Sequence, residues 1–141
     1  MDIRTLTPTY SVSPQIDPAD MAAIKDAGFG TIICNRPNAE IPPSHHDALM
    51  EEAAQAAGLD FVIIPVTHQT MTAELVAEQA GVLADAAAPV LAYCASGTRS
   101  TIVWAMGQAK NMPADDIIAA AAAAGYDIAG LRGQLDMLAE A

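Results

Sequence analysis

Three short apolar runs constrain the fold of this chain more than any other feature. They are Thr31–Asn35 (TIICN), Asp60–Val66 (DFVIIPV) and Pro89–Tyr93 (PVLAY). Apolar residues follow one another in each run without the polar alternation of a sheet that has one wet face, which is typical of strands covered on both sides. A parallel sheet between two layers of helices covers such strands. We therefore predict a three-layer α/β fold with a mainly parallel central sheet.

Helix signals alternate with these strands along the 141 residues. Asp17 followed by Pro18 predicts the start of a helix, Gly28 predicts its end, and Ser44 with Asp47 form a capping box that opens another. The other expected elements are an extended segment at Tyr10–Ile16 and helices at Pro18–Ala27, Ser44–Ala57, Thr72–Ala86, Thr101–Lys110, Pro113–Gly125 and Ile128–Leu138. No repeat or linker interrupts the pattern, and this length suits one core, so we expect residues 1–141 to form a single domain.

Composition and charge narrow the class of partner. The formal net charge is −11, with six Lys and Arg in total. Nucleic acids and anionic membranes are recognised by clusters of cations, so we expect neither as a partner. No apolar run approaches the roughly 18 residues that a membrane span requires, and the first ten residues lack the apolar core of a signal peptide. We therefore expect a cytoplasmic protein whose cysteines, Cys34 and Cys94, are reduced thiols.

The ends of the three predicted strands define the candidate site. In parallel sheets, ligands bind beyond the carboxyl ends of the strands. The chain places Cys34 to Arg36, Val66 to His68, and Cys94 at those ends. His45 and His46 are neighbours on a predicted helix and therefore point in different directions, with no other ligand cluster nearby. We expect these three loops to form one site that needs neither a metal nor a cofactor.

The turn that follows the third strand carries the chemistry. Its sequence is CASGTRS, so that Cys94 ends a buried strand and Arg99 lies in the first turn of a helix. Backbone N–H groups in such a turn form an anion-binding nest, and the helix dipole adds positive potential. The arginine fork holds two oxygens of an anion, and the Ser100 hydroxyl can donate to the sulfur. The residues expected to bind the anion are Ala95, Ser96, Gly97, Thr98 and Ser100. These groups favour thiolate over thiol, so we expect Cys94 to be an activated nucleophile.

Three further residues near the strand ends have alternative roles. Arg36 either adds positive charge to the site or pairs with Glu40 to brace its loop. His68 is the one titratable group in PVTHQTM, and it either protonates a leaving group or is a surface residue. Cys34 is either a core residue, which we favour, or a thiol that resolves an oxidised Cys94 as a disulfide.

The loop CASGTRS resembles the active-site loop of the phosphatase-like domain family of β-lactamase hydrolase-like proteins, which is also described as a sulfur transferase family. The opening YSVSPQIDPADMAAIKDAGFGTIICNRPNAE and the ending AGYDIAGLRGQL are similar to that family as well. The resemblance implies a fold like that of cysteine-dependent protein phosphatases, with Cys94 as nucleophile and Arg99 as oxyanion-binding residue. The family usually has a basic residue after the cysteine. This chain has Ala95 there, which makes the rim of the site less positive.

Turn length and a missing general acid decide our expectation about the reaction. Phosphatases of this type draw an aspartate from a loop upstream of the cysteine, and the corresponding loop here, PVTHQTM, has no carboxylate. The phosphatase signature has five residues between cysteine and arginine, whereas this chain has four, as in the loop of single-domain rhodaneses. A smaller ring of N–H groups suits one sulfane sulfur better than a phosphoryl group. We therefore expect a sulfurtransferase that carries a persulfide on Cys94 between a small-molecule donor and an acceptor thiol. The alternatives are a phosphatase that forms a phosphocysteine from a phosphoester, and a non-catalytic module that binds anions or persulfides.

Overall fold

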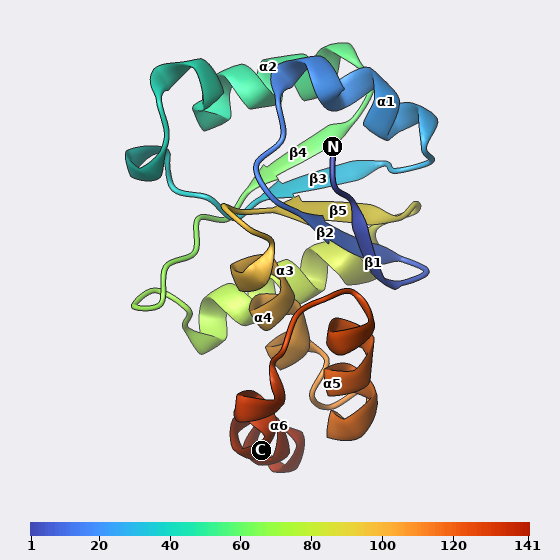
Figure 1. The fold of residues 1–141 in the computed structure, drawn as a ribbon, viewed down its shortest axis with the longest axis vertical. Helices are drawn as coiled ribbons and strands as arrows, with labels where there is room; N and C mark the ends of the chain where they lie inside the picture. The colour runs from blue at the N-terminus through green and yellow to red at the C-terminus, as the bar shows by residue number, and fades with distance from the viewer.

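A five-stranded sheet crosses the middle of the protein in the computed structural model, which describes residues 1–141 (Figure 1). Its strands lie in the order β1 (Arg4–Thr7), β2 (Tyr10–Ser13), β5 (Val90–Tyr93), β3 (Thr31–Cys34) and β4 (Asp60–Ile63). Only β1 is antiparallel to its neighbour, and the other pairs are parallel. The expectation of a mainly parallel α/β sheet is confirmed.

Helices cover both faces of this sheet (Figure 1). One layer contains α1 (Met21–Asp26) and α2 (Asp47–Ala56). The other contains α3 (Ala73–Asp85), α4 (Thr98–Gly107), α5 (Ala114–Ala123) and α6 (Arg132–Glu140). Short 3₁₀ turns occur at Pro18–Asp20, Asn38–Glu40, Pro43–His45 and Ala129–Leu131. None of the helices combines the length and the apolar character that crossing a bilayer requires.

The side chains of β5 show how the sheet separates two cores. Val90 and Ala92 belong to the core under α3–α6, whereas Leu91 and Tyr93 belong to the core under α1 and α2. Because successive side chains of a strand point to opposite faces, both faces of this strand are filled. β2, β3 and β5 are buried at every position. The apolar runs at Thr31–Asn35 and Pro89–Tyr93 therefore reflect cover on both sides, as the sequence predicts.

Four local expectations are wrong. The helix expected at Thr101–Lys110 begins and ends three residues earlier, as α4 at Thr98–Gly107. β1 was not expected, because its sequence RTLT is polar and only Leu6 is buried. The run at 60–66 is not a covered strand along its length, because β4 stops at Ile63 and forms the partly exposed edge of the sheet. The Ser44 capping box is absent, because α2 begins at Asp47, whose N–H donates to Asn38 Oδ1 at 2.8 Å.

A ring of hydrogen bonds between buried polar side chains ties α3 and α4 to the sheet. The Tyr10 hydroxyl donates to the Ser100 carbonyl at 2.8 Å and accepts from Gln79 Nε2 at 3.1 Å. Asn35 Nδ2 donates to Gln79 Oε1 at 2.8 Å, and Ser100 Oγ donates to Asn35 Oδ1 at 2.9 Å. All four side chains are buried. Because unpaired buried polar groups are costly, each member depends on the others.

Replacing Tyr10 by Phe tests this ring. Tyr10→Phe leaves Gln79 Nε2 and the Ser100 carbonyl without the partner they now share, so we expect the free energy of unfolding to fall by about 1–3 kcal/mol. Tyr93→Phe is the matched control, because the buried Tyr93 hydroxyl has no hydrogen-bond partner. Urea unfolding should show little or no loss for Tyr93→Phe. Equal losses in the two variants would contradict the role of the ring.

Candidate active site

Cys94 lies at the carboxyl end of β5, the central strand of the sheet. It is fully buried, and its Sγ accepts a hydrogen bond from the Gly97 N–H at 3.1 Å. Gly97 precedes α4 with φ of +94°, in the left-handed region that glycine adopts at little cost. This conformation turns the chain tightly enough for a backbone N–H to face the sulfur of the residue three positions earlier.

Further N–H groups of the turn are free to bind an anion. Those of Ala95, Ser96, Arg99 and Ser100 donate to no acceptor within the protein. Arg99 and Ser100 belong to the first turn of α4, where N–H groups have no partner within the helix. The dipole of α4 adds positive potential at the same place. The turn and the start of the helix therefore leave four N–H groups available for an anion, whereas the Thr98 N–H, also expected in the nest, donates to Ser96 Oγ at 3.3 Å.

Arg99 is held by a clamp of three hydrogen bonds. Its Nη1 and Nη2 donate to Glu40 Oε2 and Oε1, both at 2.7 Å, and Nη1 also donates to the Val66 carbonyl at 2.8 Å. The bonds from Arg99 lower the pKa of the Glu40 carboxyl below its usual range, and the bond to Glu40 raises the pKa of Arg99. The clamp joins the loops that follow β3 and β4 to the first turn of α4, the helix after β5, so the three strand ends meet as expected.

Sequence reasoning missed this role of Glu40. It placed a carboxylate beside Arg36, and that contact exists at 3.4 Å, while Arg36 also donates to Gln15 Oε1 at 3.2 Å. The closer pair is with Arg99, 59 residues away in the chain. Adjacent strand ends could have suggested it, because β3 and β5 are neighbours and their following loops must meet. Of the two roles left open for Arg36, the structure shows the pairing with Glu40.

The side chains of the other residues expected at the site lie in places that differ from one residue to the next. Ser100 does not donate to the sulfur, because its hydroxyl faces the sheet and bonds Asn35. Ala95, Ser96 and Thr98 are exposed at the rim. His68 is exposed, makes no hydrogen bond to the turn, and lines a cavity of about 210 Å³ with Ile102 and Met106.

Cys34 is a core residue. It stands beside Tyr93 in the register of β3 and β5, and it packs in the core under α1 and α2. Cys94 follows Tyr93 and bonds the turn before α4 on the other side of the sheet. Burial raises the pKa of the Cys34 thiol. The structure therefore does not support Cys34 as a thiol that resolves Cys94.

A family model of the phosphatase-like domain of β-lactamase hydrolase-like proteins matches residues 2–111. The chain belongs to this family. A β-lactamase hydrolase-like protein of Agrobacterium fabrum is 34% identical over 103 residues, which are 73% of this chain and 23% of the relative. One from Xylella fastidiosa Temecula1 is 26% identical over 130 residues, 91% of this chain and 30% of the relative. The chain thus spans about a quarter to a third of the length of these relatives.

Solved structures of other proteins have the same fold as this chain. A phosphatase candidate from Neisseria meningitidis Z2491 superposes with a TM-score of 0.83 at 37% identity, over 98% of this chain and 99% of that one. A kinase-associated phosphatase, solved with its catalytic cysteine replaced by serine, has a TM-score of 0.68 at 14% identity over 99% and 91%. The likeness to the second protein shows the fold alone. It confirms the expected fold of cysteine-dependent phosphatases.

These findings contradict the expectation of sulfur transfer. The family is phosphatase-like, and the structure that is 37% identical is described as a phosphatase candidate. The inference from turn length counted only the residues between Cys94 and Arg99. The free N–H groups of the structure extend beyond that interval to Ser100, since the first turn of α4 supplies donors as well. A short turn therefore does not by itself restrict the nest to a single sulfur atom.

Substituting Gly97 tests the conformation of the turn. A Cβ at this position would clash with the Tyr126 hydroxyl, which bonds the Ser96 carbonyl and so supports the turn. Gly28→Ala is the matched control, because Gly28 has φ of +102° but nothing within 4 Å of the added atom. Strain alone costs about 1–3 kcal/mol. We expect Gly97→Ala to lose clearly more unfolding free energy than Gly28→Ala, and equal losses would contradict the close packing of the turn.

The Glu40–Arg99 pair predicts a dependence of stability on pH. The pKa of Glu40 is lower in the folded protein, so the carboxylate stabilises the fold above its ordinary pKa of about 4.3, and this contribution disappears as pH falls through the folded value. The difference in unfolding free energy between the wild type and Glu40→Gln should therefore be constant near neutral pH and shrink below about pH 4. Glu52→Gln removes an exposed carboxylate outside any ion pair and should show no such change. A pH-independent difference for Glu40→Gln would contradict the account.

Proposed function

We propose that this chain hydrolyses phosphate monoesters through a covalent intermediate on Cys94. In the first step, the Cys94 thiolate attacks phosphorus and the bond to the ester oxygen breaks, so that the oxygen leaves as an alcohol after it gains a proton. In the second step, water attacks the phosphocysteine, which releases inorganic phosphate and regenerates the thiolate. The observation that carries the proposal is the buried Cys94 sulfur at the base of a turn in which the N–H groups of Ala95, Ser96, Arg99 and Ser100 have no acceptor within the protein.

Arg99 and the nest stabilise the charge that develops on the phosphoryl oxygens. Preorganised N–H donors act here without reorientation, because Gly97 and the start of α4 already hold them in place. Both Nη atoms of Arg99 bind Glu40, so the arginine approaches the anion in one fixed orientation. Glu40 is thus a positioning residue. It is not suited to donate a proton, because its lowered pKa keeps it ionised.

His68 is the residue that we propose as proton donor to the leaving oxygen. The Val66 carbonyl contacts Arg99, so the loop that carries His68 adjoins the site. A general acid matters when the leaving group is a poor one, because a good leaving group departs without a proton. His68→Gln should therefore slow an alkyl phosphate much more than 4-nitrophenyl phosphate. Equal effects on the two substrates would exclude His68 as the acid.

Hydrolysis of 4-nitrophenyl phosphate tests the reaction class. Cys94→Ser should abolish turnover, and Arg99→Lys should lower kcat about 10²–10³-fold, because a lysine does not reproduce the planar fork. Arg132→Lys is the control, since Arg132 is an exposed arginine that pairs with Asp115 on the α5–α6 side and should leave kcat unchanged. Turnover that survives in Cys94→Ser would contradict the proposal. Binding of phosphate without any turnover in the wild type would show a non-catalytic module instead.

A further inference from the structure

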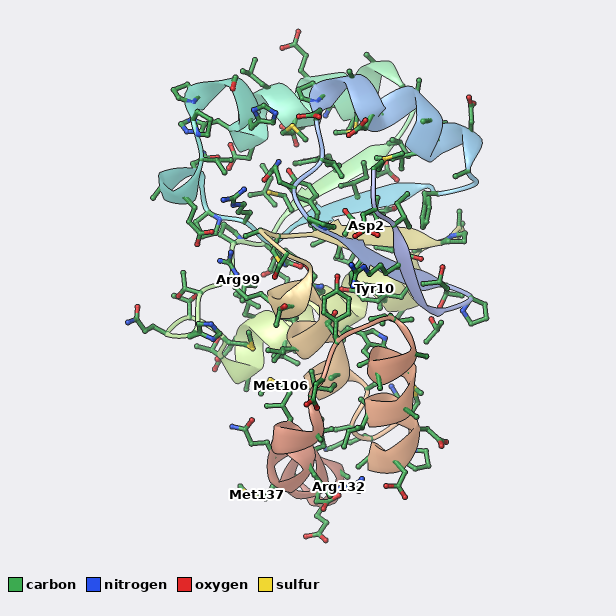
Figure 2. The ribbon with its side chains drawn as sticks, viewed as in Figure 1. Asp2, Tyr10, Arg99, Met106, Arg132 and Met137 are labelled. Atoms are coloured by element: carbon green, nitrogen blue, oxygen red, sulfur yellow. The ribbon has the colours of Figure 1, made fainter.

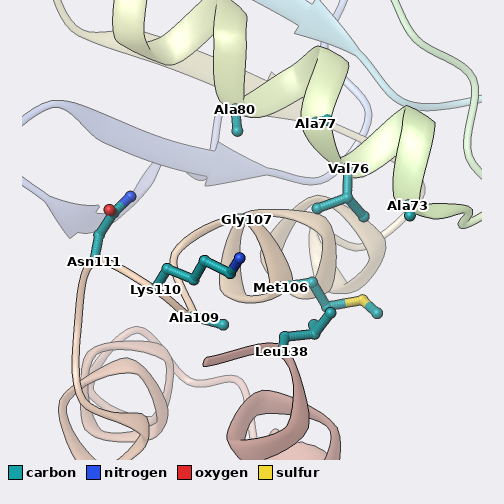
Figure 3. A pocket seen from close by; sticks show the side chains of 10 residues that line it. All are labelled: Ala73, Val76, Ala77, Ala80, Met106, Gly107, Ala109, Lys110, Asn111 and Leu138. Carbon is teal, nitrogen blue, oxygen red and sulfur yellow. The ribbon is translucent and has the colours of Figure 1, made fainter. Parts of the chain in front are cut away.

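Three cavities beneath α4 share one side chain, Met106. The first, of about 210 Å³, lies beside His68 and Ile102. The second, of about 280 Å³, is lined by Met137 and Leu138. The third, of about 560 Å³, lies between α3, α4 and the end of α6 and is also lined by Leu138 (Figure 3). We call the surface made up of these three cavities the Met106 trough, because the Met106 side chain lines all three.

Helix α4 connects the trough to the candidate active site. Arg99, Ile102 and Met106 follow one another at spacings of three and four residues, so they lie on one face of the helix. Seven residues of helix span about 10 Å. No residue of the turn lines the trough, and its near end is linked to the site through His68, which lies on the loop whose Val66 carbonyl accepts from Arg99. Figure 2 shows Arg99, Met106 and Met137 in succession along one side of the molecule.

The lining of the trough is apolar in a protein rich in acids. None of the 17 Asp and Glu side chains of the chain lines any of the three cavities. Polar side chains are few, with His68 and Gln134 near the site and Lys110 and Asn111 at the far end. Methionine is flexible and polarizable, so it adapts to an apolar group of irregular shape. Met137 is 72% exposed, although it is among the large apolar side chains of the protein.

We propose that the substrate is an amphiphilic phosphate monoester with an alkyl or acyl chain. Its phosphate binds in the nest with Arg99, and its chain lies along the Met106 trough. This inference rests on the proposed function of the nest. A phosphopeptide fits less well, because its backbone N–H and C=O groups would be buried against a lining that offers few partners. The trough lies beside α4, and the same helix carries Arg99 in its first turn, so a head group in the nest and an apolar tail in the trough would both contact one helix.

Protection of Cys94 by alkylphosphonates tests the proposal without turnover. Alkylation of Cys94 by iodoacetamide is followed by mass spectrometry in the presence of methyl-, butyl-, octyl- or decylphosphonate below micellar concentrations. The half-protecting concentration should fall by up to about fourfold per added methylene, which is the gain from fully burying one CH₂, and should then level off. A half-protecting concentration that does not depend on chain length would overturn the proposal.

Two variants and a control test where the alkyl chain of the phosphonate binds. Met106→Gln and the exposed Met137→Gln should raise the half-protecting concentration of decylphosphonate and leave that of methylphosphonate unchanged. Leu49→Gln, at a 47% exposed position on α2 across the sheet, should change neither. Unchanged length dependence in both methionine variants would overturn the proposal, as would stronger protection by a phosphotyrosine peptide than by decylphosphonate. Turnover of 4-nitrophenyl phosphate without any length dependence would reject only the amphiphile, whereas length-dependent protection without turnover would reject only the phosphatase.

Discussion

The clamp on Arg99 is the interaction on which the arrangement of the site depends. One guanidinium, carried by the helix after β5, bonds the Glu40 carboxylate from the loop after β3 and the Val66 carbonyl from the loop after β4. Backbone bonds hold the start of these loops, such as the Val66 N–H to the Asn35 carbonyl at 2.8 Å, and the guanidinium adds a link between Glu40, Val66 and α4. The buried ring of Tyr10, Asn35, Gln79 and Ser100 supports the same helix from below. Together they place the nest, the sulfur and the arginine in one rigid unit.

The clamp also limits the charge available to a substrate. Arg36 and Arg99 share one carboxylate, and Ala95 adds no cation at the rim. In a chain with a net charge of −11, a dianionic phosphate gains little from long-range attraction. Binding must then depend on the N–H donors close to Cys94 and on contacts made by the rest of the substrate. An apolar chain along the Met106 trough would supply such contacts, which joins the electrostatics of the site to the proposed substrate class.

The sequence predicted the features that depend on residues close together in the chain, such as an apolar run or a turn before a helix. The runs TIIC and VLAY became fully buried parallel strands, and the turn after Cys94 led into a helix with Arg99 in its first turn. It did not predict β1, whose polar residues carry no strand signal, or the Glu40–Arg99 pair, whose partners lie far apart in the chain. The reaction class was wrong because residue spacing within the turn does not count the donors contributed by α4 beyond Arg99.

Trapping of the covalent intermediate tests the central claim most directly. The protein is mixed with 4-nitrophenyl phosphate, quenched in acid and digested, and the phosphate is located by mass spectrometry. The account predicts phosphate on the peptide that contains Cys94, and none on that peptide in Cys94→Ser. Release of phosphate without a phosphocysteine, or phosphate bound to another residue, would contradict it.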